Sequence, residues 1–151
     1  MKVLGIHVAT GQCRFSVLEG ARGTPTLIEK GRLVTPSHDN VPALMDWYDS
    51  QFRQLVTSHS PDKLAYRLTL DPKKDQLFCS EFPLGVLNLI AHQRSLPITH
   101  YTARSFTPTR LGLHKSVDIY AYCDVVFGRN PPHWDNPQKH SLLVAWFELP
   151  K

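Results

Sequence analysis

The sequence predicts an α/β fold built on a mixed five-stranded sheet, and three observations support this prediction. Three extended, apolar segments separated by short turns begin the chain. A segment with helical periodicity follows them. Extended and helical segments then alternate, so that the complete order is β-β-β-α-β-α-β-α. This order is typical of a sheet that is covered by helices.

The first three extended segments predict an antiparallel meander. They span residues 1–8, 12–19 and 26–34, and the tight Ala9-Thr10-Gly11 turn separates the first two. Pro25 introduces the third segment, which is rich in β-branched residues.

A helix is predicted next, because apolar side chains recur at spacings of three and four residues. Asp39 or Asn40 can cap its first turn, which contains Pro42. The apolar face contains Val41, Leu44, Met45, Tyr48, Phe52, Leu55 and Val56. We expect this helix to lie on the sheet and to end at residues 60–62, where Pro61 interrupts it.

The second half of the chain predicts two more strands and two more helices. The strands are residues 63–70 and 98–102, and the first of them is parallel to the N-terminal strand if the preceding helix is a crossover. The helices are residues 82–92 and 114–127, and residues 71–75 and 105–112 are predicted loops.

The C-terminal segment differs in composition from the rest. Residues 128–140 contain three prolines and predict irregular structure, whereas residues 141–149 are strongly apolar. We therefore predict a domain at residues 1–127 and a C-terminal extension at residues 128–151 that packs on the domain or on a partner. Trp146 and Phe147 are candidate interface residues, and the alternative is a tail that folds back on its own domain.

The charge distribution indicates a possible phosphate-binding surface. The chain of 151 residues has a formal charge of +4. Residues 92–115 contain no carboxylate but carry Arg94, Arg104, Arg110 and Lys115. Such a surface favours binding of nucleic acid, because neutralised phosphates release counterions. The alternative is an ordinary solvated connection.

Cysteine usage and hydropathy predict a cytoplasmic protein without a membrane anchor. Cys13, Cys79 and Cys123 are widely spaced and form no Cys-x-x-Cys pair, as expected in a reducing compartment. No apolar run approaches the roughly 20 residues that cross a bilayer, and the N-terminus has no signal-peptide pattern.

Several short motifs resemble the RuvC-like branch of the ribonuclease H-like nucleases. They are the opening Leu4-Gly5-Ile6 hairpin and residues 62–67 and 115–122, and together they cover residues 1 to about 127. Residues 73–78 and 112–115 also resemble a family of small uncharacterised bacterial proteins of the same fold. The resemblance implies a ribonuclease H-like fold with a C-terminal extension.

The resemblance places the metal-binding site of the resolvases at His7, Arg67 and Asp118, of which only Asp118 is a carboxylate. Two-metal cleavage of phosphodiesters needs hard oxygen ligands around ions roughly 4 Å apart. The resemblance therefore implies a degenerate nuclease site without a cofactor. We expect Arg67 and Asp118 to form an ion pair where the metal ions would lie.

Three functions remain open at this point. The preferred one is a non-catalytic RuvC-like domain that binds nucleic acid or belongs to a nucleoprotein complex. The second is a divergent nuclease that holds Mn²⁺ or another transition metal at His7, His114 and Asp118, a set of two histidines and one carboxylate. The third is a protein–protein scaffold or homodimer without a role on nucleic acid.

Overall fold

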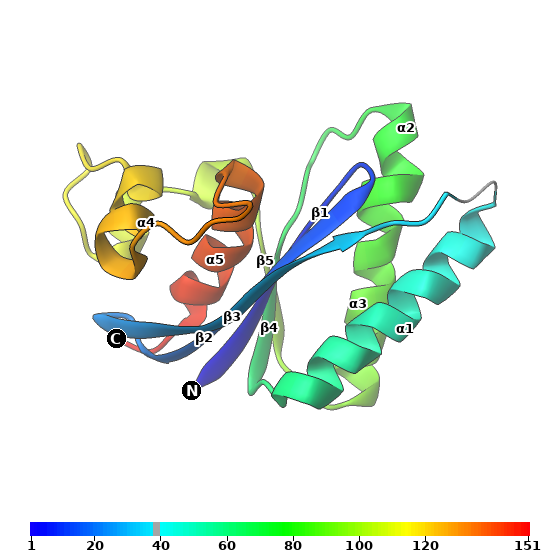
Figure 1. Ribbon diagram of the computed structural model, residues 1–151, viewed down its shortest axis with the longest axis horizontal. Helices are drawn as coiled ribbons and strands as arrows, with labels where there is room; N and C mark the ends of the chain where they lie inside the picture. Colours follow the sequence, from blue (N-terminus) through cyan, green and yellow to red (C-terminus); the bar gives the residue numbers. More distant parts are fainter. Residues whose placement is uncertain (38–39) are drawn as a thin grey trace.

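The strands of the computed structural model form one mixed sheet in the order β3-β2-β1-β4-β5 (Figure 1). The structure describes residues 1–37 and 40–151. Strands β1 (Lys2–Ala9), β2 (Gln12–Ala21) and β3 (Thr24–Val34) are antiparallel neighbours. Strands β4 (Lys63–Arg67) and β5 (Ile98–Tyr101) are parallel to β1. The predicted α/β class and the mixed five-stranded sheet are thus confirmed.

Helices α1 (Val41–His59) and α3 (Phe82–Gln93) cover one face of the sheet (Figure 1). The Asn40 side chain caps α1 by accepting a hydrogen bond from Ala43 N at 2.7 Å, as the sequence suggested; Asp39 lies outside the described residues. Two short helical turns, α2 (Lys74–Gln76) and a π-helical turn (Leu77–Glu81), precede α3. The first begins inside the polar loop predicted at residues 71–75, and no element was predicted for residues 76–81. The apolar faces of α1 and α3 pack on the even-numbered side chains of β1, Leu4, Ile6 and Val8.

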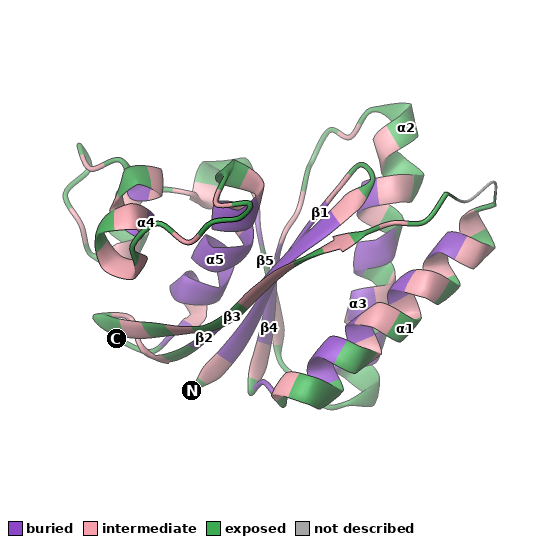
Figure 2. Ribbon diagram, in the orientation of Figure 1, coloured by how far each residue is buried: buried purple, intermediate pink, exposed green. Residues whose placement is uncertain are grey.

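The opposite face of the sheet is covered by α5 (Asn136–Glu148), which the sequence did not predict as a helix (Figure 2). Nine of its residues are buried on several sides, so its sequence has no distinct apolar stripe. Its start is marked locally, because Asp135 caps the first turn and Pro137 follows. Residues 138–149 therefore pack largely in the core of the domain, whereas residues 128–136 are mostly exposed.

Two expectations about the C-terminal half need correction. Trp146 and Phe147 are only 2% and 3% exposed and pack inside this core, so they are not interface residues. The helix expected at residues 114–127 is shorter: α4 (Ile119–Phe127) begins five residues later, after the turns Ala103–Ser105 and Pro108–Leu111. Among the described residues, no helix combines the length and the apolar character that a membrane span requires.

The packing of α5 on β1 depends on Gly5. A Cβ atom at this position would lie 2.0 Å from the backbone oxygen of Ser141 and 2.9 Å from Ala145 Cβ. The helix backbone thus lies directly against the strand. Beside this contact the buried hydroxyls of Ser16 and Ser141 are 2.7 Å apart, and Gln138 Nε2 donates to Phe15 O at 2.8 Å. These polar contacts fix the position of α5 over β1 and β2.

Candidate functional site

Three basic side chains lie in a row on the α5 side of the sheet, near the carboxyl ends of its parallel strands. His7 pairs with Arg14 in the register of β1 and β2. Arg67 follows the β1–β4 pair Ile6 and Tyr66, and it ends β4. The carboxyl ends of parallel strands are the usual position of ligand sites in open α/β sheets. The row Arg14–His7–Arg67 therefore occupies the candidate site of this fold.

His7 is buried and uncharged at neutral pH. Its side chain is 8% exposed, and Nδ1 has no hydrogen-bond partner among the described residues. Burial, followed by the influence of His140, Arg67 and Arg14, lowers its pKa to about 3. A neutral imidazole beside two arginines does not attract Mg²⁺, which prefers charged oxygen ligands.

His140 of α5 lies directly above His7. The two rings meet edge to face, with centroids 4.9 Å apart. His140 Nε2 lies 3.1 Å from the Tyr120 hydroxyl, and Phe106 packs against the ring at 5.3 Å. Burial and then the charge of Arg67 lower the pKa of His140 to about 4. The helix residue that faces β1 at this site is thus a second neutral imidazole.

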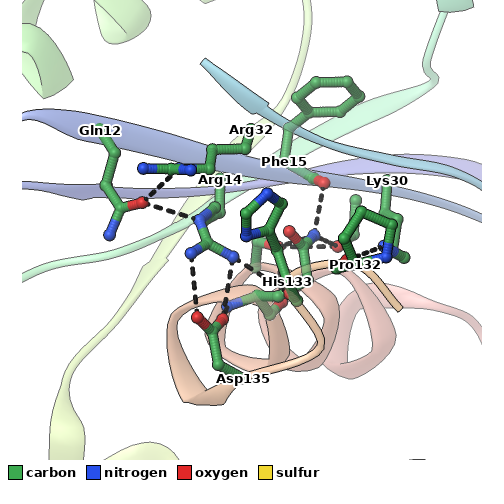
Figure 3. Close-up of polar contacts among 11 residues, drawn as sticks. Gln12, Arg14, Phe15, Lys30, Arg32, Pro132, His133 and Asp135 are labelled. Carbon is green, nitrogen blue, oxygen red and sulfur yellow. Dashed lines mark hydrogen bonds and ion pairs between the residues drawn. The ribbon is translucent and has the colours of Figure 1, made fainter. Parts of the chain in front are cut away.

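A bidentate ion pair joins the start of α5 to β2 (Figure 3). Arg14 Nη1 and Nη2 contact the two carboxylate oxygens of Asp135 at 2.8 and 3.0 Å, and Nη1 also donates to His133 O at 3.1 Å. Burial opposes ionisation of Asp135, but the hydrogen bonds from Arg14 and from Gln138 N outweigh it and lower the pKa of this carboxyl. Asp135 is therefore occupied by Arg14 and by the helix N-terminus.

Two hollows open beside this row and share Arg67 and Thr69. The first has a volume of about 300 Å³ and is lined by His7, Thr10 and Glu81 in addition to the shared pair. The second, of about 370 Å³, extends to Arg104. We call the joined hollows the Arg67 groove. It runs along the carboxyl ends of β1, β4 and β5.

The side chains of the Arg67 groove carry mixed charge. The guanidinium of Arg67 lies 5.5 Å from the ring centroid of Phe106, which orients it. Burial raises the pKa of Glu81, while Thr69 and Arg67 act in the opposite direction. Arg67 Nε and Glu81 Oε2 are both buried without a hydrogen-bond partner among the described residues.

The predicted basic residues do not form one surface. Arg104 lines the Arg67 groove, as a phosphate contact would. Arg94 lies at the end of α3, near Thr57 and shortly before the start of β5, away from the carboxyl ends of the strands. Arg110 stacks on Tyr101 with its Cζ 5.0 Å from the ring centroid. Lys115 is exposed in the loop before α4.

Asp118 is not part of the site, which corrects the expected convergence of His7, Arg67 and Asp118. Its carboxylate caps α4 by accepting hydrogen bonds from Tyr120 N at 2.9 Å and Ala121 N at 3.3 Å. The expected ion pair between Arg67 and Asp118 is absent from the contacts of the described residues. The reason is that α5, and not the helix after residue 114, crosses β1 at the site.

The alternative metal ligands are also separated in the structure. His114 Nδ1 lies 2.7 Å from Ser116 Oγ, and Asp118 is engaged by the backbone of α4. Within residues 1–37 and 40–151, no three His, Cys, Asp or Glu side chains are grouped as metal ligands. The side chains present at the site, two neutral imidazoles and two guanidinium groups, do not fit a pair of Mg²⁺ ions.

Four residues of this site were not predicted from the sequence: Arg14, Glu81, Asp135 and His140. Arg14 could have been found, because the short Ala9-Thr10-Gly11 turn sets the hairpin register that pairs it with His7. Asp135 stands before Asn136-Pro137, which is a helix-start signal. His140 and Glu81 carry no local signal, since only tertiary packing brings them to the groove.

Comparison with solved structures identifies the fold. Thermus thermophilus RuvC in complex with a Holliday junction substrate superimposes with a TM-score of 0.76 at 14% identity, covering 97% of this chain and 92% of the other. The yeast mitochondrial Holliday junction resolvase gives 0.72 at 11% identity, with coverages of 96% and 76%. The fowlpox virus Holliday junction resolvase gives 0.57 at 8% identity, with coverages of 99% and 94%. No protein-family model and no curated protein matches the sequence.

The similarity extends beyond the part of the chain that the sequence motifs cover. A match to 97% of the chain includes most of residues 128–151, and so it includes α5. The chain has a ribonuclease H-like fold of the RuvC-like form, as the sequence motifs implied.

Proposed function

We propose that this chain binds nucleic acid through the Arg67 groove and does not cleave it by the two-metal mechanism. Arg67 carries the proposal, because it puts a fixed positive charge at the carboxyl end of β4 and forms no ion pair among the described residues. The RuvC-like nucleases bind metal ions at the corresponding position of their first strand. Here the guanidinium groups of Arg67 and Arg104 take over the favourable interaction with phosphate.

The shape and charge of the groove support binding to a phosphodiester backbone. Arg67 and Arg104 line adjoining hollows, and Thr69 lines both of them. Arginine suits this role because its planar fork of donors matches phosphate oxygens. The groove also carries Glu81 and Asp71, so we expect moderate affinity that depends strongly on salt.

The choice of probe follows from the structural neighbours. The Thermus thermophilus structure contains a Holliday junction substrate, and the yeast and fowlpox proteins are Holliday junction resolvases. A four-way DNA junction is therefore the first ligand to test. Duplex DNA and single-stranded DNA and RNA complete the series.

The experiment is a fluorescence-anisotropy titration of each probe at several salt concentrations. We expect binding at low salt that weakens as salt rises. The double variant Arg67→Gln/Arg104→Gln should weaken binding by roughly tenfold or more and reduce the salt slope by about one per lost phosphate contact. Incubation of the wild type with Mg²⁺ or Mn²⁺ should leave the probes uncut.

Arg94→Gln is the matched control, since it removes an exposed arginine at the end of α3, outside the Arg67 groove. It should leave affinity nearly unchanged. Absence of binding to every probe at low salt would contradict the proposal and favour a protein scaffold. Equal losses of affinity in Arg94→Gln and in the groove variant would indicate that the binding surface lies outside the Arg67 groove. Metal-dependent cleavage that a His7 variant abolishes would restore the nuclease hypothesis.

A further inference from the structure

We propose that a second hollow, between β3 and the loop before α5, binds a backbone phosphate group of the bound nucleic acid. This inference rests on the proposed function and extends it to a surface outside the Arg67 groove. The hollow has a volume of about 380 Å³, and its lining includes Lys30 and Arg32 of β3 and Pro132 and His133 of the loop (Figure 3). We call it the Arg32 hollow.

Strand alternation gathers the basic side chains of β3 on the α5 side of the sheet. Arg32 pairs with Arg14 and Lys30 with Ser16 in the register of β2 and β3. Directly opposite residues of neighbouring strands share a face. Because Arg14 and Ser16 contact residues of the α5 segment, Lys30 and Arg32 face that side too. Glu29, the one carboxylate of β3, alternates to the other face, where it pairs with a histidine of α1.

The basic side chains of the Arg32 hollow keep donors for a ligand. The ion pairs of residues 1–37 and 40–151 include neither Lys30 nor Arg32. Arg32 is exposed, and it donates from Nε to a glutamine of β2 at 2.9 Å, so its two Nη groups face solvent. Lys30 donates to Pro132 O at 2.8 Å, which uses one of its three donors. A ligand that enters from solvent can therefore reach both side chains.

The surroundings of the Arg32 hollow favour an anion. Arg14 lies beside it and donates to His133 O at 3.1 Å. The nearby carboxylate of Asp135 is already held by both Nη groups of Arg14. Burial and the charge of Arg14 lower the pKa of Lys30, against the opposite effect of Asp135. A bound phosphate would offset this repulsion between cations, and the fork of Arg32 matches phosphate oxygens.

The Arg32 hollow and the Arg67 groove are far enough apart to hold different phosphates. Arg32, Arg14 and His7 follow one another in register across β3, β2 and β1, and His7 is level with Arg67 of β4. Neighbouring strands are about 4.8 Å apart, so the backbones of Arg32 and Arg67 are separated by about 14 Å. A strand of several nucleotides or a junction can contact both places, and the two contacts then add to the affinity.

The test is a salt-titrated anisotropy measurement of Arg32→Gln with dodecathymidine, dodecacytidine and the four-way junction. We expect binding to weaken roughly three- to tenfold, by the same factor for both single strands, and the salt slope to fall by about one. Arg32→Lys keeps the charge and should keep the salt slope. Arg94→Gln is again the control and should change neither quantity.

Three further measurements exclude indirect explanations. The melting temperature of Arg32→Gln should equal that of the wild type, since the side chain is exposed. Lys30→Gln should reproduce the loss of affinity. Combination of Arg32→Gln with Arg67→Gln/Arg104→Gln should multiply the separate losses, because effects of sites more than 10 Å apart are usually additive in free energy.

Titration calorimetry with inorganic phosphate identifies the source of the phosphate group. We expect weak binding of the free anion, because a single phosphate lacks the second contact in the Arg67 groove. Tight binding of inorganic phosphate that Arg32→Gln removes, together with unchanged binding of nucleic acid, would make the hollow a small-anion site and overturn the inference.

The remaining outcomes separate the Arg32 hollow from the Arg67 groove. Unchanged affinity and salt slope in Arg32→Gln, or losses equal to those in Arg94→Gln, would overturn the hollow while groove binding stands. Loss of affinity in Arg32→Gln but not in Arg67→Gln/Arg104→Gln would support the hollow and overturn the groove. Failure of every strand and of the junction to bind would overturn both proposals.

Discussion

His7 and His140 are held neutral by their surroundings. His7 is buried and His140 is partly buried, and the guanidinium of Arg67 adds a repulsive charge to each protonated form. The pKa of His7 falls to about 3 and that of His140 to about 4. A pair of touching imidazoles, with ring centroids 4.9 Å apart, can remain in the core because neither ring carries charge.

These two histidines predict a loss of stability in mild acid. In the unfolded chain a histidine titrates near pH 6.5, so below that pH the unfolded state binds more protons than the folded state. The free energy of unfolding should therefore fall as the pH decreases from 6.5 toward the folded pKa values, by about 1.4 kcal/mol per pH unit for each histidine. Urea unfolding between pH 4.5 and 7.5 measures this slope.

His7→Gln should reduce the dependence on pH in this range, because it removes one of the two groups. His92→Gln replaces an exposed histidine on α3 and is the matched control. The wild-type slope should persist in the control. A slope that is the same in His7→Gln and in the wild type would show that His7 is not buried as a neutral group.

At the scale of the element, α5 is the segment on which the site depends. It provides His140 above His7, and its N-cap Asp135 holds Arg14. Its backbone lies against β1 because position 5 is glycine. The helix is thus positioned by one missing side chain and by polar contacts at its N-terminal half. A small change at Gly5 should displace the helix and with it the site.

Gly5→Ala should destabilise the protein, since its Cβ would overlap the Ser141 backbone oxygen. We expect a loss of about 1–3 kcal/mol or more in the free energy of unfolding, as for other overpacked cores. Gly85→Ala is the control, because Gly85 lies in α3 with no atom within 4 Å of the added Cβ. It should stabilise the helix by about 0.4–1 kcal/mol. Denaturant unfolding of both variants checks the pair.

For the whole molecule, the two faces of the sheet are packed by different means. The face under α1 and α3 is covered by amphipathic helices whose apolar stripes are visible in the sequence. The face under α5 combines apolar packing with a buried polar network and the Arg14–Asp135 pair. On this second face the charge of Arg14 is balanced by Asp135. We therefore expect the fold to need no metal ion.

Thermal unfolding with EDTA, Mg²⁺ and Mn²⁺ tests this expectation. The melting temperature should remain the same in all three conditions, because a ligand that binds only the folded state would raise it. Asp118→Ala should lower stability by about 1 kcal/mol in each condition, since Asp118 is the N-cap of α4 and not a metal ligand. A Mn²⁺-dependent increase of several degrees that Asp118→Ala removes would contradict this assignment.

Local signals predicted those parts of the fold that local interactions determine. The sequence predicted the hairpin turn at Gly11, the capped and amphipathic helix α1, and the strands, because their patterns repeat within a few residues. Helix α5 could not be predicted from the sequence, since burial on several sides removes the apolar periodicity that marks a surface helix. The candidate site was predicted in part: His7 and Arg67 belong to it, and Asp118 does not.

The sequence by itself determined the fold class, the order of the strands along the chain, and the presence of His7 and Arg67 at two positions that the RuvC-like resemblance assigns to a metal site. These follow from strand and helix periodicity and from the identity of His7 and Arg67. Only the tertiary structure decided which helix crosses the first strand, and so which residues meet His7. That choice depends on contacts between residues more than 100 positions apart, such as Arg14 with Asp135 and Ser16 with Ser141, and no local pattern records them.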